Sequence, residues 1–453
     1  MKMRPHSELK FMNPNIASSS KSSVTPKRVS MIAYTNYSSD GRVRLEAESL
    51  VKWGYDVFFL VPKKEGKPRT YTLGGVNIRE LNVVKYGGKN KFRYIASYMT
   101  FLILAFVACT RLFVQSRVRV IHVHNMPDVL VFAAIIPRMF GCKVVLDLHD
   151  TVPETYQAKF GKISNFLLFL LRIEERLCCS MAHQIICVNH VQRDAVIRRG
   201  IAAEKIAIVI TMPRFIPQPR VCQQTKGERP FRMVNHGTIA KRLGNDLIID
   251  AAAKLVHEIP GFELHIIGRG DNLDQLLSLT RSFGLENRVH FHSTVPWDEL
   301  AAKLSIMDVG IVANRISAAT QLMLPAKLID YAVLGIPAIV PRLKGIEYYF
   351  SEDMVSYFEP EDVDSMVTAT VSLYRDGARR ERQAQNAKKF LYEWQWEGPN
   401  NGLRRLYENL FDPKLTCPQS EESDDRTEVL MSQSAAAEEG AENIGGVGSS
   451  GEL

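Results

Sequence analysis

Histidines stand at the ends of two short apolar segments of the chain. His122 and His124 alternate along "VIHVHN", and His149 precedes Asp150 at the end of "VVLDLHD". A neutral imidazole at such a place can accept a proton from a hydroxyl group or hydrogen-bond a sugar. From the residues alone, a histidine that caps a helix or pairs with Asp150 is favoured by roughly two to one. Three histidines could also bind a metal, but they lack the compact spacing of zinc ligands.

A glycine and two basic residues occupy the loop "HGTIAKRLGND", His236–Asp246, after a predicted strand. Gly237 lets the backbone approach a ligand closely. Lys241 or Arg242 could hold a diphosphate, for which the guanidinium fork is well suited. A solvated basic turn is the alternative, and it explains either charge equally well.

The segment "LMLPAKLIDYAVLGIPAIV", Leu322–Val340, contains two charges within an apolar run. Pro325 and Gly335 predict a helix between them. Lys327 and Asp330 are three residues apart and therefore share one face of that helix. They form either an exposed ion pair worth about 0.2–0.5 kcal/mol or part of a nucleotide site. In such a site the helix N-terminus would face a diphosphate and Asp330 would accept hydrogen bonds from a ribose.

These residues need a scaffold that brings strand ends together, and the chain predicts one. Short apolar segments alternate with helical ones over residues 28–210 and again over 231–412, with a Pro- and Gln-containing linker at 211–230. This alternation indicates two α/β domains, each with a doubly wound parallel sheet. We expect the domains to face each other across a cleft that binds ligands beyond the strand ends. Residues 1–27 and 413–453 are predicted to be disordered.

Two apolar segments of the first domain are predicted helices. One is 127–141, "PDVLVFAAIIPRMFG", and the other is Tyr94–Phe113, which is nearly long enough to span a bilayer. A true span would split the domain across the membrane, because strands are predicted on both sides of it. A buried or membrane-surface helix is therefore expected, and the basic flanks "GGKNKFR" and "RLFVQSRVR" suit an anionic lipid surface.

Composition limits the class of protein and of its partners. The 453 residues are 46% apolar and 23% charged, which is ordinary for a globular protein. The net charge of +8 favours phosphorylated small molecules, acidic lipids or nucleic acid. Nucleic acid is least favoured, because the basic residues are dispersed and lack an aromatic-lined motif. The seven cysteines form no CxxC pair and the N-terminus has no apolar secretory segment, so a reducing cytoplasm is expected.

Several segments resemble a known family when they are taken in order. They are "SSDGRVRLEAESLVKWGYDV", "VIHVHNMPD", "VVLDLHDTVPE", "VNHGTIAKRLGNDLIIDAAAKL", "FELHIIGRG", "LAAKLSIMDVGIVAN" and "LPAKLIDYAVLGIPAIV". Over residues 28–412 the chain resembles a retaining glycosyltransferase of family 4. The resemblance implies the GT-B fold, two Rossmann-like domains facing across a cleft, and metal-independent transfer from a nucleotide-sugar.

The resemblance also implies roles for individual residues of the first domain. His149 matches the family's cleft histidine. The resemblance therefore favours a role in the reaction over a histidine that only caps a helix or pairs with Asp150. Gly41 stands where the family's first loop meets donor phosphate and acceptor, although a helix start capped by Ser39 or Asp40 explains it as well. The residues expected on the acceptor side are Gly41, Arg42, His124 and Asp150.

The donor loop of the second domain departs from the family pattern. Matching on Gly237 and Gly244 places the family's phosphate-binding arginine at Thr238 and its lysine at Leu243. Arg242, one step from the lysine position, is the expected replacement, and the preceding lysine has a supporting role.

Two further segments complete the expected donor site. Gly268, in "HIIGRGDN", lies where the family approaches the base and ribose, with a plain turn as the alternative. The family's two signature glutamates fall on Asp330, a conservative change, and on Leu322, which cannot hydrogen-bond a sugar. The groups that could replace the missing acid are Gln321 and the backbone amides of Met323 and Leu324.

The sequence thus predicts sugar transfer with retention to a glycan or polyprenyl-linked acceptor, in the synthesis of cell-surface or extracellular polysaccharide. His149 and Arg242 are the expected catalytic residues. The protein is expected in the cytoplasm, peripherally bound at the inner face of the cell membrane, with no cofactor and no metal. The alternatives are a nucleotide-sugar epimerase or phosphorylase of the same fold, and a non-catalytic nucleotide-sugar-binding subunit, for which Leu322 is the motivation.

Overall fold

The fold is described in a computed structural model. The described residues are 27–412, apart from residues 87, 89, 162, 214–228, 397, 399 and 400. The predicted tail 413–453, nearly all of the predicted extension 1–27 and most of the predicted linker 211–230 lie outside the described residues.

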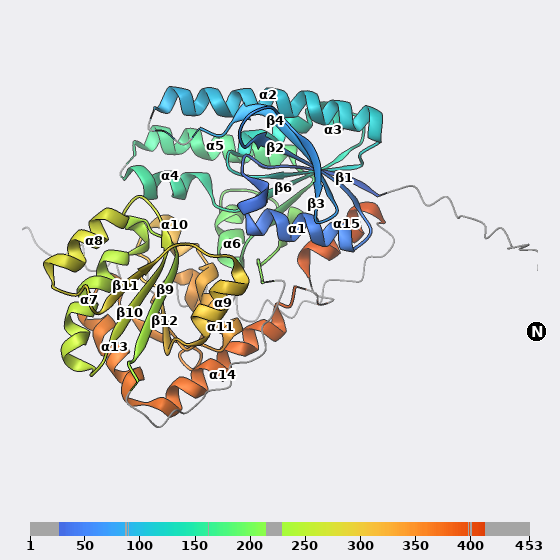
Figure 1. The fold of residues 1–453 in the computed structure, drawn as a ribbon. Helices are drawn as coiled ribbons and strands as arrows, with labels where there is room; N and C mark the ends of the chain where they lie inside the picture. Colours follow the sequence, from blue (N-terminus) through green and yellow to red (C-terminus); the bar gives the residue numbers. More distant parts are fainter. Residues whose placement is uncertain are drawn as a thin grey trace, which may run out of the picture. The chain divides into compact units, whose positions relative to one another are not determined.

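Eight strands form the sheet of the first domain, in the order β3-β4-β2-β1-β5-β6-β7-β8 (Figure 1). All neighbouring strands are parallel except β3 and β4, which form an antiparallel hairpin at one edge. The strands are β1 (Arg28–Ile32), β2 (Asp56–Lys63), β3 (Thr70–Leu73), β4 (Val76–Val84), β5 (Val120–His124), β6 (Lys143–Leu148), β7 (Gln184–Cys187) and β8 (Ile206–Ile208).

Helices connect these strands and supply the apolar faces that cover the sheet. They are α1 (Gly41–Lys52), α2 (Lys91–Ser116), α3 (Ile135–Met139), α4 (Val152–Phe160), α5 (Asn165–Met181) and α6 (His190–Arg198). The single helix predicted over 127–141 was wrong, because Asp128–Ala134 is a 3-10 helix that leads into the short α3. Pro137 has no N–H and its ring would clash with the carbonyl of Ala133, so one α-helix cannot run through this segment.

Six parallel strands form the second sheet, in the order β11-β10-β9-β12-β13-β14. They are β9 (Arg232–Thr238), β10 (Glu263–Arg269), β11 (Val289–His292), β12 (Val309–Ile311), β13 (Ala338–Pro341) and β14 (Ser356–Phe358). The helices that follow them are α7 (Asn245–Glu258), α8 (Leu273–Ser282), α9 (Trp297–Ser305), α10 (Ala318–Gln321), α11 (Ala326–Leu334), α12 (Lys344–Glu347), α13 (Val363–Arg375) and α14 (Gly377–Glu393). A further helix, α15, spans Gly402–Phe411. Two doubly wound parallel sheets confirm the predicted fold class.

Helix α2 combines a buried stripe with an exposed apolar face. Its buried side chains pack on the core of the first domain: Phe101, Ala105, Ala108, Cys109 and Leu112. Its exposed apolar side chains are Phe92, Ile95, Met99, Ile103, Val107 and Val114. In the described chain this is the one helix that is long and apolar enough, over Phe92–Ser116, to cross a membrane by length and composition alone. The buried stripe packs this helix on the core of the domain, but only 28% of its apolar window is buried, and its expected place at a membrane surface stays a prediction.

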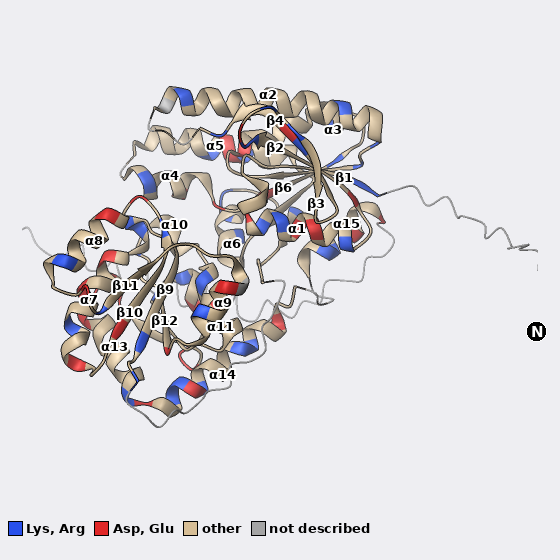
Figure 2. Cartoon of the chain, in the orientation of Figure 1, with Lys and Arg blue, Asp and Glu red and all other residues tan. Residues whose placement is uncertain are grey.

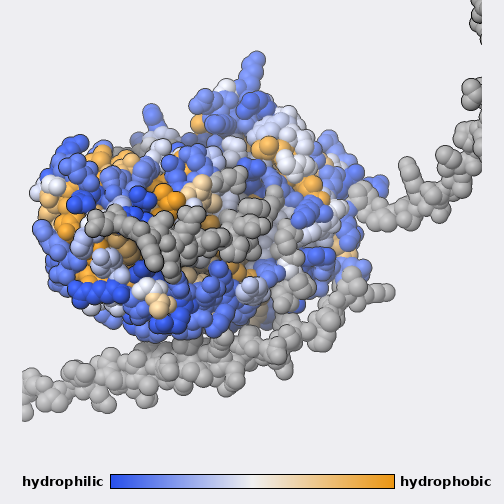
Figure 3. All heavy atoms as spheres, turned by 60° about the horizontal axis from the view of Figure 1, so that its bottom comes forward, coloured by the Kyte–Doolittle hydropathy of each residue, from blue (hydrophilic) through white to orange (hydrophobic). Residues whose placement is uncertain are grey.

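Helix α5 presents apolar side chains on the same side of the sheet. Both α2 and α5 pack against the 3-10 helix Asp128–Ala134, and Figure 1 shows them running along one side of the first domain. The exposed apolar residues of α5 are Phe166, Phe169, Leu170, Ile173 and Leu177. The face drawn in Figure 3 differs from the apolar faces of α2 and α5. Hydrophilic residues predominate on it, and apolar residues lie in small groups.

Candidate active site

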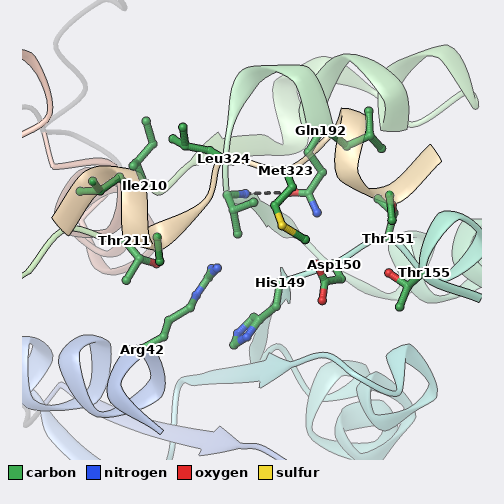
Figure 4. Close-up of a pocket in the computed structure, with 15 residues that line it drawn as sticks. Arg42, His149, Asp150, Thr151, Thr155, Gln192, Ile210, Thr211, Met323 and Leu324 are labelled. Carbon is green, nitrogen blue, oxygen red and sulfur yellow. Dashed lines mark hydrogen bonds between the residues drawn. The ribbon is translucent and has the colours of Figure 1, made fainter. Parts of the chain in front are cut away.

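A cavity of about 250 Å³ is lined by residues of both the first and the second domain. In Figure 4, Arg42 and His149 point into it from the first domain, and Met323 and Leu324 lie across from them on the segment before α11. The residues on which the site is built are Arg42, His149, Asp150, Leu322, Met323 and Leu324. Several of the predicted residues of both domains therefore meet in one place.

His149 follows β6 and is held there by polar neighbours. Its backbone N–H donates to Asn125 Oδ1 at 2.8 Å, and its Nε2 lies 3.0 Å from Asp147 Oδ2. Burial raises the pKa of Asp147, but the Arg42 guanidinium and His149 outweigh this and hold that pKa well below its usual range. In the neutral tautomer that donates from Nε2 to Asp147, Nδ1 of His149 is the ring nitrogen that can accept a hydrogen bond from a substrate hydroxyl.

Asp147 is the centre of a buried network. Its Oδ1 lies 2.6 Å from Arg42 Nη2, and its Oδ2 lies 2.9 Å from His124 Nδ1. Arg42 also donates from Nε to Glu46 at 3.1 Å. Burial and the negative charge of Asp147 raise the pKa of Glu46 well above its usual value, whereas the pKa of Asp147 is lowered, so the two neighbouring carboxyl groups are shifted in opposite directions.

His124 lies behind His149 in this network. It is 1% exposed, and it does not line the cavity defined by the described residues. Burial and neighbouring His122 lower its pKa to about 3. Its predicted place on the acceptor side is therefore indirect, because it contacts Asp147 and His149 (Nε2 at 3.1 Å).

Among the described residues near the cavity, potential metal ligands converge in this same network. Ligand atoms of Glu46, His122, His124 and Asp147 lie within 4.8 Å of one another. The guanidinium of Arg42 is bonded to both carboxyl groups, however, and supplies the positive charge that a cation would bring. This competition is consistent with the expectation of transfer without a metal, which stays a prediction.

Lys327 and Asp330 are both largely buried, which excludes the surface ion pair. Lys327 is 9% exposed and donates from Nζ to Asn235 Oδ1 at 2.7 Å. Burial, with help from the charge of Arg242, lowers the pKa of Lys327 to about 8. Burial raises the pKa of Asp330 to about 7, and its Oδ2 lies 3.6 Å from Nε2 of His236. Both groups can therefore change charge near neutral pH.

The predicted phosphate loop stands beside these residues. Gly237 has φ +103°, and Thr238, Lys241 and Arg242 follow it as exposed residues. Burial raises the pKa of Asp150 above its usual value, and the charge of Arg242 offsets part of that rise. The same charge helps burial to lower the pKa of Lys327. Arg242 thus acts electrostatically on residues of both domains, but it is not among the described residues that line the cavity, and its catalytic role stays a prediction.

The fold alone explains why glycine stands at positions 41 and 268. Gly41 is the first residue of α1, and Asp40 caps that helix by accepting from the Val43 N–H at 3.4 Å. A Cβ on Gly268 would stand 1.9 Å from the carbonyl oxygen of Gly237 on the neighbouring strand. The helix-start alternative at Gly41 is therefore confirmed, and Gly268 is required by the close approach of β9 and β10.

The neighbourhood of Leu322 narrows the choice of groups that could replace the missing acid. The Oε1 of Gln321 is engaged, because it accepts from the Lys344 N–H at 2.9 Å, but its amide NH2 can still donate. The Met323 N–H donates to Thr320 O at 3.3 Å. The Leu324 N–H and the Gln321 NH2 are therefore the proposed donors for which the described residues provide no partner. Leu322 itself lines the cavity, and its carbonyl accepts from Asn189 Nδ2 at 2.8 Å.

The buried residues that hydrogen-bond to the side chains of the site and hold them in place were not identified from the sequence. Asp147, near the end of β6, stands two positions before His149, and Glu46 lies one helical turn after Arg42. Both spacings could have shown these contacts. Asn235, which holds Lys327 from 92 positions away in the chain, had no such local signal.

Two family models match the chain. One, described as a glycosyl transferase 4-like domain, matches residues 41–210, and the other, glycosyl transferases group 1, matches residues 222–390. A GDP-mannose-dependent alpha-(1-6)-phosphatidylinositol monomannoside mannosyltransferase of Mycolicibacterium smegmatis is 26% identical over 214 residues, which is 45% of this chain and 56% of that protein. The sulfoquinovosyl transferase SQD2 of Arabidopsis thaliana is 22% identical over 63% of this chain and 55% of its own length. The chain thus spans about half the length of the curated relatives it matches.

Solved structures share the fold. Sucrose-phosphate synthase of Thermosynechococcus elongatus has a TM-score of 0.68 at 17% identity, covering 85% of this chain and 99% of its own. Anabaena HepE, in complex with UDP and glucose, has a TM-score of 0.60 at 13% identity with the same coverage. These likenesses show the two-domain fold in which the cavity lies.

Proposed function

This chain belongs to the group 1 glycosyltransferases with a glycosyltransferase 4-like domain, and we propose that it transfers a sugar with retention from a nucleotide-sugar donor to a hydroxyl of a glycan or lipid-linked acceptor. One observation carries the proposal: His149, oriented by Asp147, faces the cavity opposite the segment that leads into α11. That arrangement places a hydrogen-bond acceptor for a sugar or acceptor hydroxyl across from a place for the donor.

The donor diphosphate would lie between Arg242, Lys327 and the start of α11. The first N–H groups of a helix are free of intrahelical partners and favour a negative charge. Lys327 is held by Asn235 at 2.7 Å and therefore brings its charge at little cost in side-chain entropy. These groups would stabilise the charge that develops on the departing diphosphate.

Arg42 and Asp150 would bind the acceptor from the first domain. Both line the cavity beside His149. Retention is proposed from the family, through attack by the acceptor hydroxyl on the same face from which the diphosphate leaves, with His149 binding a hydroxyl rather than acting as a covalent nucleophile. Exclusion of water from the cavity would favour transfer over hydrolysis.

We place the acceptor at a membrane surface. Residues 81–146 contain nine lysines and arginines and a single acid, Asp128, which is 1% exposed. Helix α2 accordingly shows no acidic residue in Figure 2. The exposed apolar side chains of α2 lie within this basic region, a combination that suits an anionic lipid surface. Helix α5 lies outside residues 81–146, but it packs like α2 against the 3-10 helix Asp128–Ala134 and adds exposed apolar side chains of its own. A peripheral position at the inner face of the cell membrane, and a role in cell-surface polysaccharide synthesis, follow from this proposal.

The test is a transfer assay with purified protein and a panel of labelled UDP- and GDP-sugars, with and without lipid-linked and oligosaccharide acceptors. Acceptor-dependent transfer with retention of the anomeric configuration is expected. Interconversion of the free nucleotide-sugar without acceptor would support the epimerase, and phosphate-dependent cleavage of a glycoside would support the phosphorylase. Binding without turnover would support the non-catalytic subunit. His149→Ala should abolish transfer but leave nucleotide affinity intact, and unchanged turnover would remove His149 from the mechanism.

A further inference from the structure

A second cluster of histidines lies on the outer strands of the second sheet. Glu263 and His265 alternate along β10, and His290 and His292 alternate along β11, so that each pair faces one side of the sheet. The register places His265 directly opposite His290. None of the four is among the described residues that line the cavity. The proposed transfer reaction makes no use of this cluster.

The nitrogen and oxygen atoms of the cluster converge on one point. Nε2 of His265 lies 3.5 Å from Oε2 of Glu263. Ligand atoms of Glu263, His265 and His290 all lie within 4.8 Å of one another. Atoms that share one zinc ion at about 2.0–2.2 Å in tetrahedral geometry stand about 3.3 Å apart. The first pair therefore already has the required spacing, and His290 needs only a small side-chain movement.

The other nitrogen of His265 fixes the orientation of the ring. Nδ1 of His265 lies 3.1 Å from Nε2 of His292, and the planes of the two rings are nearly parallel, 10° apart. If Nδ1 carries the hydrogen and donates to His292, Nε2 presents a lone pair toward Glu263 and His290. Metal-binding histidines usually donate their second ring nitrogen to a neighbour in this way. Nε2 of His265 is buried and has no hydrogen-bond partner among the described residues.

We propose that Glu263, His265 and His290 bind a zinc ion, and that His292 orients the ring of His265 through its Nδ1. Two imidazoles and one carboxylate form a ligand set that zinc accepts, with a water in the fourth position. The side chains of His265 and Glu263 are 13% and 24% exposed, so the ion can enter from solvent. Because β11 is the edge strand of the sheet, the ion would tie this edge to β10.

Arg232 is the natural competitor for the site. Its Nε donates to Oε2 of Glu263 at 3.1 Å, the same oxygen that faces His265. A zinc ion would have to displace this guanidinium, which is 29% exposed and can move into solvent. Removing Arg232 should therefore tighten zinc binding, an effect that nonspecific surface binding would not show.

The experiment titrates the metal-free full chain with ZnCl2 in competition with a chromophoric chelator. One saturable equivalent is expected, together with a rise in melting temperature, since an ion that binds only the folded state stabilises it. Glu263→Gln and His265→Gln should each weaken binding at least tenfold, and Arg232→Gln should tighten it. His257→Gln removes an exposed histidine of α7 outside the cluster and should change nothing.

Three results would overturn the proposal: no saturable binding by the wild-type chain, equal binding by His265→Gln, or equal losses in the cluster variants and His257→Gln. A cobalt complex supplies a separate check, because a thiolate-to-cobalt charge-transfer band would assign the ion to cysteine. His290→Gln serves in the same way if His265→Gln does not fold, as judged by circular dichroism.

Discussion

The carboxylate of Asp147 lies 3.0 Å from Nε2 of His149, and neither residue could do the proposed work alone. The exposed edge of His149 faces the cavity, whereas Asp147 is fully buried. A buried carboxylate is stable as an anion only when it is paired, and Arg42 supplies that pairing at 2.6 Å. The anion then fixes which nitrogen of His149 carries the hydrogen, and so which one faces a substrate.

Replacement of Asp147 by asparagine should lower turnover at least about 100-fold, because His149 would lose the partner that orients it. Glu46→Gln is the matched control. Burial and Asp147 raise the pKa of Glu46, so glutamine resembles its protonated form, and turnover should stay within about threefold of wild type. The measurement is kcat for transfer, with nucleotide affinity by calorimetry in both variants. Equal losses would show that the network maintains folding rather than orientation.

The sequence predicted the two sheets because their strands are continuous apolar segments, but it missed peripheral strands. The hairpin β3–β4 carried a usable signal, since Gly74 and Gly75 between alternating residues both have positive φ angles in the turn. Strand β14 is three residues long, too short for any periodic pattern. Local pattern therefore accounts for the central strands and not for the edges.

Residues of the candidate site that follow a predicted strand could be located from the sequence. Contacts that depend on how distant segments pack could not. His149, Arg42 and the segment before α11 follow from their places in the alternating pattern. The pairing of Lys327 with Asn235 on β9 joins positions far apart in sequence, and it argues against the exposed ion pair with Asp330 that was one of the two alternatives. The burial of Lys327 and Asp330 excludes the exposed ion pair, and burial can be read only from the folded chain.

Nucleoside diphosphate affinity should fall above about pH 8. Burial lowers the pKa of Lys327 to about 8, so the free protein carries this charge below that pH and loses it above. A diphosphate binds the charged form, and each pH unit beyond the pKa of the free protein should therefore weaken binding by up to about tenfold. Calorimetry across pH 7 to 9.5 checks this. Lys327→Met should bind weakly at every pH and lose the alkaline decline, whereas Asp330→Asn should keep it. A decline that persists in Lys327→Met would assign it to another group.

Alanine at Gly268 should destabilise the second domain by at least about 2 kcal/mol, since its Cβ would stand 1.9 Å from the backbone oxygen of Gly237 and a backbone atom cannot rotate away. Gly41→Ala is the comparison, because no described heavy atom outside its own helix and chain neighbours lies within 4 Å of a Cβ there. Its stability should be unchanged or slightly raised. Thermal and urea unfolding measure both. If Gly268→Ala unfolds like wild type, the close approach of β9 and β10 is not what requires glycine.

The exposed apolar residues of α2 and α5 should bind anionic vesicles. Ile103 on α2 and Phe169 on α5 are 60% and 58% exposed, and burial of each such side chain in lipid is worth roughly 1.5–3 kcal/mol. The double change Ile103→Glu with Phe169→Glu should therefore weaken binding at least tenfold, since it also adds two charges that anionic lipid repels. Tyr392→Glu, at a 75% exposed aromatic on α14, should bind like wild type. Cosedimentation with phosphatidylglycerol–phosphatidylcholine vesicles, repeated with phosphatidylcholine alone and at high salt, separates the two contributions. Wild-type protein that stays in the supernatant, or a loss equal in Tyr392→Glu, would show that this face does not bind lipid.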